Sequence, residues 1–410
     1  MFTALIKSSN FRRLFTALLL SSTGLWFYYV GVSVLVYHLT GSALSVGIIF
    51  MTRQAPVIFF SFVGGVIADH YNKRLVMPMC KLLSALTILF IFFVNTTQDV
   101  WLIYVIGFVS ACLGSTFQPC RMAAIHDVID PALQKTANVY FNAAENLTMI
   151  FSASLAGVLY AAYGIQILLV LNFILNIFSA LLIFSIRDLG ITKQISSVTS
   201  SFKQRVLAGW RCIRTTPKLN KMFHYNVYSQ IGFCAYFIII TIYPIKLFSL
   251  DSQGVGFFYS IYGLGTVIAL LFSTYVSQKD VLFYETLRPY LVFVHGLFFV
   301  FLSLTSSAAF GMILFLAATT TYMIYYLSQE NIKLLLTDKI YMGRVSAFQN
   351  SITIIVLIIF STVYGKIGDL LSVRAIGLSA GLFLVFFPLL YELLYSLGPK
   401  TFSMESETSS

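Results

Sequence analysis

The sequence predicts an all-α membrane protein with twelve transmembrane helices in two pseudo-symmetric six-helix bundles. Hydrophobic residues make up 58% of the chain and charged residues only 10%, whereas a soluble domain carries about 25% charged residues. Apolar segments of about 20 residues, the length that crosses a bilayer, follow one another along the chain. The net charge of +11 lies mostly in the loops between these segments, which argues against a nucleic-acid surface.

Each predicted span is bounded by short polar or basic loops and holds enough residues to cross about 30 Å of hydrocarbon. In chain order the spans are 14–37, 44–68, 75–95, 100–121, 137–161, 165–186, 222–246, 254–276, 288–306, 308–328, 346–366 and 373–397.

Basic residues set the orientation of these spans. The longest basic loop joins the sixth and seventh spans and contains Arg187, Lys193, Lys203, Arg205, Arg211, Arg214, Lys218 and Lys221. Loops on the cytoplasmic side of a membrane protein are enriched in lysine and arginine. We therefore expect both termini and this loop to be cytoplasmic.

The two halves of the chain resemble each other at a shift of about half the chain. Ser45-Val46-Gly47 corresponds to Gly254-Val255-Gly256, and Phe141-Asn142 corresponds to Phe348-Gln349. Repeated halves place a substrate site at their interface near the middle of the membrane. The predicted parts are an N-terminal bundle (1–186), a cytoplasmic linker (187–221), a C-terminal bundle (222–397) and a cytoplasmic tail (398–410).

The loop between the second and third spans carries a recognisable motif. Gly65, Asp69, Lys73 and Arg74 fit the pattern G-x-x-x-D-x-x-x-[RK]-[RK]. A glycine lets a neighbouring helix approach closely, an aspartate can meet a helix N-terminus or a basic side chain, and the basic pair can lie at the lipid headgroups. In this context the loop resembles the conformational-switch motif of the major facilitator superfamily.

Further segments resemble the bacterial drug:proton antiporters of that family, which include macrolide-efflux proteins and the enterobactin exporter. These segments are Asn10–Arg12, Leu39–Ala43 and Arg53–Pro56. The resemblance implies proton-driven export of an amphipathic small molecule, a drug or siderophore, across the bacterial inner membrane. Two places depart from the pattern: Gln278 stands at the repeat of Asp69, and Ser152–Gly157 lacks the proline of a Gly-Pro motif.

Two basic residues lie away from the ends of predicted spans, where an ionised side chain costs about 2.5–3.5 kcal/mol. Arg53 lies near the middle of the second span, and we expect it to face a cavity or to be paired structurally. Lys81 lies two turns into the third span and could extend to the cytoplasmic surface.

The fifth span carries a polar stripe that includes Asn142, Glu145 and Asn146. Such a stripe must face protein or water. A carboxyl group withdrawn from water has a raised pKa and can exchange protons near neutral pH. Glu145 is therefore the leading proton-coupling candidate, followed by Asp127 and Glu330, and the alternative for Glu145 is a fixed ion pair, for example with Arg53.

Polar and aromatic residues of other spans are candidates for the substrate cavity. Together with Arg53, Asn142 and Asn146 they are Trp26, Tyr228, Gln349 and Asn350.

No phosphate-binding loop or catalytic constellation is visible in the sequence, so we expect a transporter and not an enzyme. We expect no cofactor and no metal, a monomer in the bilayer, and a small-molecule substrate together with protons as partners. Two alternatives to export stay open: proton-coupled import of a small solute such as a siderophore, and translocation of a lipid or lysophospholipid.

The orientation gives a first prediction. Topology reporters fused after Ser410 and within the 247–253 loop should report opposite sides of the membrane, with the Ser410 fusion in the cytoplasm, because basic loops are retained there. The same response from both fusions would contradict the predicted arrangement.

Overall fold

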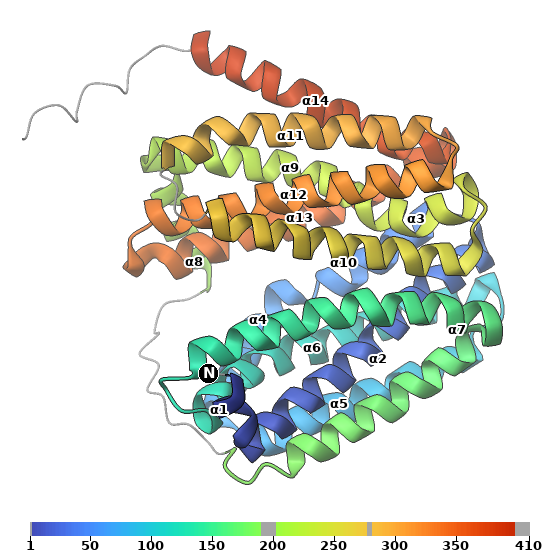
Figure 1. Cartoon of the computed structure of the whole chain (residues 1–410), viewed down its shortest axis with the longest axis vertical. Helices are drawn as coiled ribbons and strands as arrows, with labels where there is room; N and C mark the ends of the chain where they lie inside the picture. The colour runs from blue at the N-terminus through green and yellow to red at the C-terminus, as the bar shows by residue number, and fades with distance from the viewer. Residues whose placement is uncertain (1, 190–201, 277–280, 398–410) are drawn as a thin grey trace, which may run out of the picture.

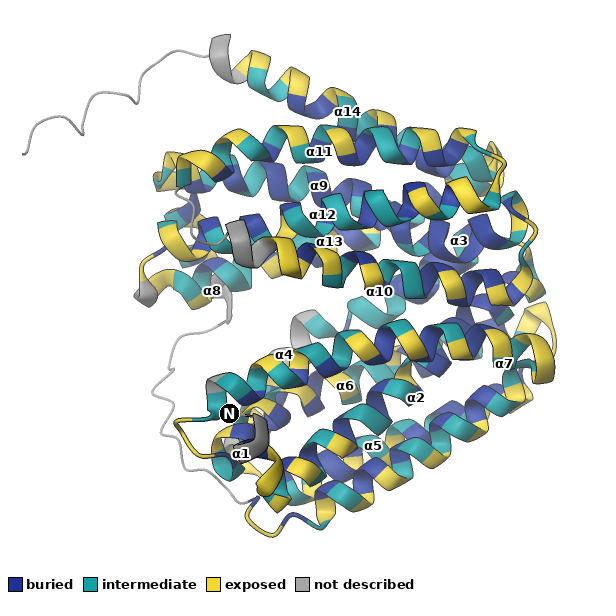
Figure 2. Cartoon of the chain, viewed as in Figure 1, coloured by how far each residue is buried: buried dark blue, intermediate teal, exposed yellow. Residues whose placement is uncertain are grey.

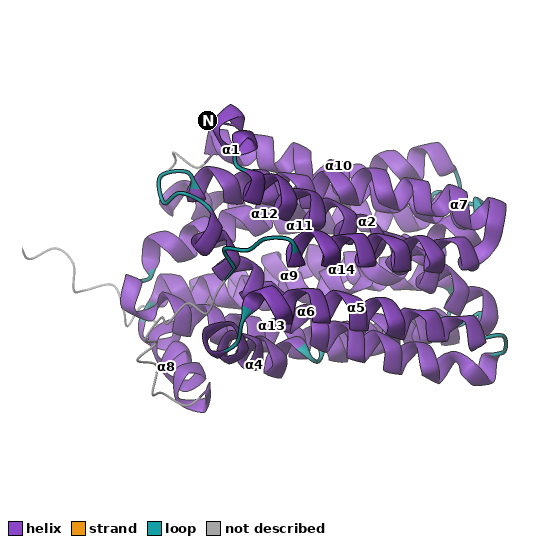
Figure 3. Ribbon diagram, turned by 90° about the horizontal axis from the view of Figure 1, so that it is seen from below, coloured by secondary structure: helices purple, strands orange, loops and turns teal. Residues whose placement is uncertain are grey.

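The computed structural model describes residues 2–189, 202–276 and 281–397, and these residues form helices joined by short turns (Figure 1 and Figure 3). The helices of the first half are α1 (Phe2–Lys7), α2 (Ser9–Thr40), α3 (Ala43–Gln54), α4 (Val57–His70), α5 (Lys73–Leu89), α6 (Val100–Val128) and α7 (Gln134–Phe184). Those of the second half are α8 (Phe202–Thr215), α9 (Pro217–Ile242), α10 (Asp251–Val276), α11 (Val281–Leu304), α12 (Ala308–Leu336), α13 (Lys339–Leu370) and α14 (Val373–Leu397). Short 3-10 or π turns lie at Phe90–Phe93, Thr97–Asp99 and Tyr243–Leu247.

Ten helical segments of the described residues are long and apolar enough to cross a membrane. The segment Thr136–Phe184 counts as two spans, because Gly164 has φ 73° and ψ −171° and interrupts α7 there. A side chain disfavours this backbone conformation, whereas glycine adopts it readily. The helices α3 and α4 form one further span, divided at Pro56. The result is the twelve spans that the sequence predicts.

Large apolar side chains stay exposed along these helices. Phe151 is 70% exposed and Phe386 is 63% exposed, and exposed residues recur along the helices at the surface of the molecule (Figure 2). Exposed apolar surface of this extent is typical of helices in contact with lipid.

The helices form two groups. In Figure 1, α2 and α4–α7 lie in one group and α9–α14 in the other, while α3, which continues into α4, lies against the second group where the two meet. The helix α8 belongs to the segment that the sequence predicts to be a linker. It packs on α13, since a Cβ atom on Gly209 would collide with the carbonyl oxygen of Arg344.

The two groups meet at one end of the molecule. We call the end with Lys73 and Ser185 the linker end, and the end with Gly164 and Leu370 the opposite end. A Cβ atom on Gly157 of α7 would lie 2.9 Å from the Cα of Gly256 on α10. A Cβ atom on Gly47 of α3 would lie 2.7 Å from the carbonyl oxygen of Ser361 on α13. Small residues at these crossings allow the backbones to touch.

A carboxylate fastens the opposite end. Asp369, near the C-terminus of α13, accepts hydrogen bonds at the N-terminus of α3 from the Ala43 N–H (2.6 Å), the Leu44 N–H (3.2 Å) and the Ser42 hydroxyl (2.6 Å). A negative charge at a helix N-terminus is favourable, because free N–H groups and the helix dipole point toward it. Asp369 therefore links the two groups.

Further contacts between the groups lie between the middle of the helices and the opposite end. The Ser260 hydroxyl donates to the Ile150 carbonyl (2.6 Å), and the rings of Phe50 and Phe237 stack at 4.3 Å. Toward the linker end the groups diverge (Figure 1). The molecule is thus closed at the opposite end.

We predict that Asp369→Ala loosens this closure. Loss of the acceptor should cost about 1 kcal/mol in the closed state, or about a fivefold shift in the equilibrium between closed and open states. The distance between spin labels at Gln166 and Gln253, in a background without the native cysteines, should be longer in a larger fraction of the variant molecules than of the wild type. Asp99→Ala is the matched control, because the Asp99 carboxylate accepts a hydrogen bond from the Thr96 N–H of its own turn (2.9 Å) and does not link the two groups. Equal distance distributions for the two variants would argue against a latch.

Candidate functional site

A cavity of about 700 Å³ lies inside the first group of helices. Its walls come from α2, the α3–α4 span, α5, α6 and both halves of α7. The polar and charged lining residues include Arg53, Gln54, Lys81, Gln118, Glu145, Asn146, Asn172 and Asn176, and Trp26, Tyr28, Tyr29 and Phe117 add aromatic rings. A pocket of this size, mostly apolar with a few polar groups, suits a small organic molecule.

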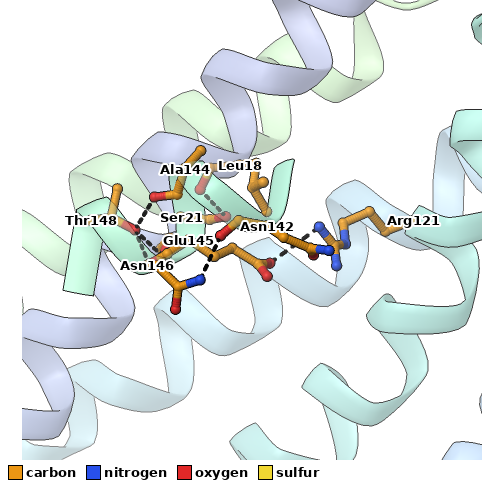
Figure 4. A network of polar contacts seen from close by, with 9 residues as sticks. Leu18, Ser21, Arg121, Asn142, Ala144, Glu145, Asn146 and Thr148 are labelled. Carbon is orange, nitrogen blue, oxygen red and sulfur yellow. Dashed lines mark hydrogen bonds and ion pairs between the residues drawn. The ribbon is translucent and has the colours of Figure 1, made fainter. Parts of the chain in front are cut away.

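An ion pair forms one edge of the cavity. A carboxylate oxygen of Glu145 lies 3.1 Å from Nη1 of Arg121 (Figure 4). The Arg121 side chain is 4% exposed and that of Glu145 is 37% exposed. The carboxylate is therefore accessible from the cavity, while the guanidinium is buried behind it.

Helical spacing on α7 gives Glu145 its polar neighbours. The Asn146 amide donates to the Asn142 carbonyl (3.0 Å), and the Thr148 hydroxyl lies within hydrogen-bonding distance of the Ala144 and Glu145 carbonyls (2.9 and 2.8 Å; Figure 4). The suggested pair of Glu145 with Arg53 is wrong, because Arg121 of α6 lies closer and takes this role.

Arg53 interacts with aromatic rings instead. Its Cζ atom lies 3.0 Å from the ring centroid of Tyr29 and 5.2 Å from that of Phe50. It also lines a smaller cavity of about 40 Å³ that shares Trp26 and Tyr29 with the main one. That smaller cavity is completed by Phe237, Ile240, Tyr236, Tyr259 and Tyr262 of the second group. Arg53 thus stands where the two groups meet.

Lys81 faces the main cavity from α5. Its Nζ atom lies 4.0 Å from the ring centroid of Phe117 on α6. A cation over an aromatic face is stabilised by about 0.5–2 kcal/mol.

The switch motif forms a separate network at the linker end. The Nζ atom of Lys73 lies 3.0 Å from a carboxylate oxygen of Asp127, and Lys73 is fully buried. Arg74 donates from Nε to the Phe184 carbonyl (2.9 Å). The side chain of Asp69 lies outside the part that the structure describes. Asp127 is therefore held by the motif and is not among the residues that line the main cavity.

The predicted close approach at Gly65 is wrong. A Cβ atom there would have no heavy atom within 4 Å, whereas one on Gly64 would lie 2.6 Å from the Ser115 carbonyl oxygen. The neighbouring glycine therefore makes the helix contact between α4 and α6.

The second group places its candidates elsewhere. Glu330 pairs with Lys333 (2.6 Å) and lies 3.5 Å from the Gln349 amide. Tyr228 stacks on Phe387 of α14 with 3.4 Å between ring centroids. Asn142, Tyr228, Gln349 and Asn350 are not among the residues that line the main cavity, and their predicted substrate roles stay predictions.

Two cavity residues in the sixth span were not predicted from the sequence. Asn172 donates to the Gly24 carbonyl (2.6 Å), and Asn176 donates to the Asn172 carbonyl (3.0 Å). The signal in the sequence is their spacing: two asparagines one helical turn apart in an otherwise apolar span share one face of the helix, and that face must contact protein or water.

Comparison with known proteins decides the family. The family model described as Major Facilitator Superfamily matches residues 14–361. The chain belongs to the major facilitator superfamily. It is accordingly a multi-pass membrane transporter and not an enzyme.

Two Bacillus subtilis (strain 168) relatives carry the names "Uncharacterized MFS-type transporter YfiS" and "Uncharacterized MFS-type transporter YkuC". The first is 27% identical over 166 residues, 40% of this chain and 39% of the relative. The second is 24% identical over 202 residues, 49% of this chain and 46% of the relative. The matched part thus spans less than half the length of either relative.

Solved transporters share the fold at low sequence identity. A mutant form of the nucleoside transporter NupG superposes with a TM-score of 0.74 at 11% identity, covering 93% of this chain and 100% of that one. A bacterial homologue of the human lysosomal transporter Spinster, in an inward-facing and unoccupied conformation, gives 0.71 at 11% identity over 94% of this chain and 96% of that one. At this identity the likeness concerns the fold alone.

The Arg121–Glu145 pair of this transporter gives a stability prediction. Glu145→Ala should lower the free energy of unfolding by about 2 kcal/mol, because it leaves the buried guanidinium without its carboxylate. The double variant Glu145→Ala/Arg121→Met should recover most of that loss. Thermal midpoints of the purified protein measure both effects, and a double variant no more stable than Glu145→Ala would contradict the pairing.

Proposed function

We propose that this transporter exports an amphipathic small molecule, such as a drug or siderophore, by proton-coupled alternating access across the bacterial inner membrane. The observation that carries the proposal is the Arg121–Glu145 pair at the edge of a mostly apolar cavity large enough for such a molecule. It brings a group that can bind a proton next to the space for the solute.

Closure at the opposite end supports entry of the solute from the linker end. The basic loops favour a cytoplasmic position for the linker end and both termini. A solute would then enter from the cytoplasm, and rocking of the two groups would expose it to the other side.

Proton binding would change the charges around the cavity. Ionised Glu145 neutralises Arg121 at 3.1 Å. Protonated Glu145 loses this Coulomb attraction and leaves the guanidinium without a counter-charge. The pair is thus a two-state element whose balance both the proton and the solute can bias.

The network of Lys73, Arg74 and Asp127 is our candidate for control of the exchange between states. Its contacts join the start of α5 to the ends of α6 and α7 at the linker end, away from the cavity lining. We include Asp69 and Gly65 in this motif on the basis of the sequence pattern.

We predict that Glu145→Gln abolishes uphill, proton-driven transport but leaves downhill exchange of the solute. The amide keeps the shape of the side chain and cannot cycle a proton, and only net uphill transport requires that cycle. The solute is first identified by comparing metabolites inside and outside cells with and without the protein. Inside-out vesicles with an imposed pH gradient then measure its accumulation.

Glu330→Gln serves as the matched variant in the second group, where Glu330 pairs with Lys333. Normal uphill transport by Glu145→Gln, combined with its loss in Glu330→Gln, would move the coupling site to the second group. Accumulation of the solute by intact cells instead of its exclusion would establish the import alternative.

A further inference from the structure

The lining of the main cavity carries an excess of positive charge. Its charged residues are Arg53, Lys81 and Glu145. Glu145 is already neutralised by Arg121, which lies behind it. Two cations therefore remain without a compensating carboxylate on the cavity wall.

No ion pair within 4.0 Å involves Arg53 or Lys81 among the described side chains. The ion pairs of that part of the chain form at Lys73, Arg121, Lys221 and Lys333. Arg53 and Lys81 rest on the rings of Tyr29 and Phe117 instead. Both cations thus keep their charge available to a molecule in the cavity.

Energetics favour a ligand with the opposite charge. A cation within a span costs about 2.5–3.5 kcal/mol, and an aromatic face returns about 0.5–2 kcal/mol of this. Water in the cavity can supply part of the remainder, but a bound anion would add direct Coulomb attraction in a medium of low dielectric constant. Burial of two such cations in one cavity is therefore best explained by an anionic ligand.

The rest of the wall calls for an apolar body on that ligand. Trp26, Tyr29 and Phe117 supply ring faces, and Leu25 and Ile88 add aliphatic surface. In the second group, the charge of Glu330 is neutralised by Lys333, whose Nζ atom lies 2.6 Å from the Glu330 carboxylate.

We infer that the transported solute is an amphipathic organic anion, an aromatic or aliphatic body bearing a carboxylate or sulfonate, with Arg53 and Lys81 as its counter-charges. This inference rests on the proposed transport through the cavity and adds the chemical class of the solute. It selects against cationic drugs, which the same two side chains would repel.

A pair of probes of opposite charge tests the inference. Naphthalene-2-sulfonate and naphthalen-2-ylmethylammonium share an aromatic body and differ in the sign of the charge. Isothermal titration calorimetry of the full chain in nanodiscs, with empty nanodiscs as blank, should show at least tenfold tighter binding of the sulfonate. Equal affinities, or a preference for the ammonium probe, would overturn the inference.

Variants locate the site. Arg53→Gln and Lys81→Gln should each weaken sulfonate binding about tenfold, whereas Lys81→Arg should retain it. The matched control is Lys366→Gln, because Lys366 is an exposed lysine of α13 outside the cavity lining. An equal loss of sulfonate affinity in Lys366→Gln would show that the overall charge of the protein causes the effect, and this would contradict the assignment.

Binding is measured at equilibrium, so its outcome is independent of proton coupling. Selective sulfonate binding in a protein whose Glu145→Gln variant still pumps uphill would uphold the anion site and refute the proposed coupling residue. Uphill transport that Glu145→Gln abolishes, in a protein that binds both probes equally, would uphold the coupling residue and refute the anion site. Where a variant is poorly folded, the affinity ratio of the two probes on the wild-type sample decides the inference.

Discussion

A charge inside the membrane must be compensated, and this constraint organises the first group of helices. Lys73 and Arg121 meet carboxylates at 3.0 and 3.1 Å, whereas Arg53 and Lys81 are held by aromatic rings. The two kinds of compensation differ in consequence. An ion pair neutralises the charge of its cation, while a ring leaves most of the charge available. Lys73 and Arg121 therefore have a counter-charge within the protein, whereas Arg53 and Lys81 are suited to a ligand.

The second group treats the equivalent position differently. The shift that aligns Phe141 with Phe348 also aligns Lys81 with Arg288. Arg288 is 1% exposed, lies 5.4 Å from the ring centroid of Tyr225, and has no hydrogen-bond partner for its three guanidinium nitrogens among the described atoms. The repeat thus keeps a cation at this position of both halves but opens only one of them to the main cavity. The two halves share a fold without sharing a role.

Much of the fold could be predicted from the sequence, because span length and loop charge act locally. Pro56 divides the second span and Gly164 separates the fifth span from the sixth, and both residues can be read in the sequence. The site was harder to predict. Glu145, Asn146, Trp26 and Arg53 do line the cavity, but which cation pairs with Glu145 depends on how α6 and α7 rotate against each other. A one-dimensional pattern does not contain that rotation. For the same reason Tyr228 turned out to face α14, and Gly64 instead of Gly65 makes the helix contact.

The unpaired cations of the cavity also bear on the voltage across the membrane. A solute carrying one net negative charge gains about 2.3 kcal/mol for every 100 mV when it leaves a cell whose interior is negative. Outward movement of such a solute is therefore electrically downhill even without a pH gradient. Inward movement would need at least two accompanying protons to use the potential. The reversal potential of the current carried by the transporter would then report how many protons move with each solute molecule.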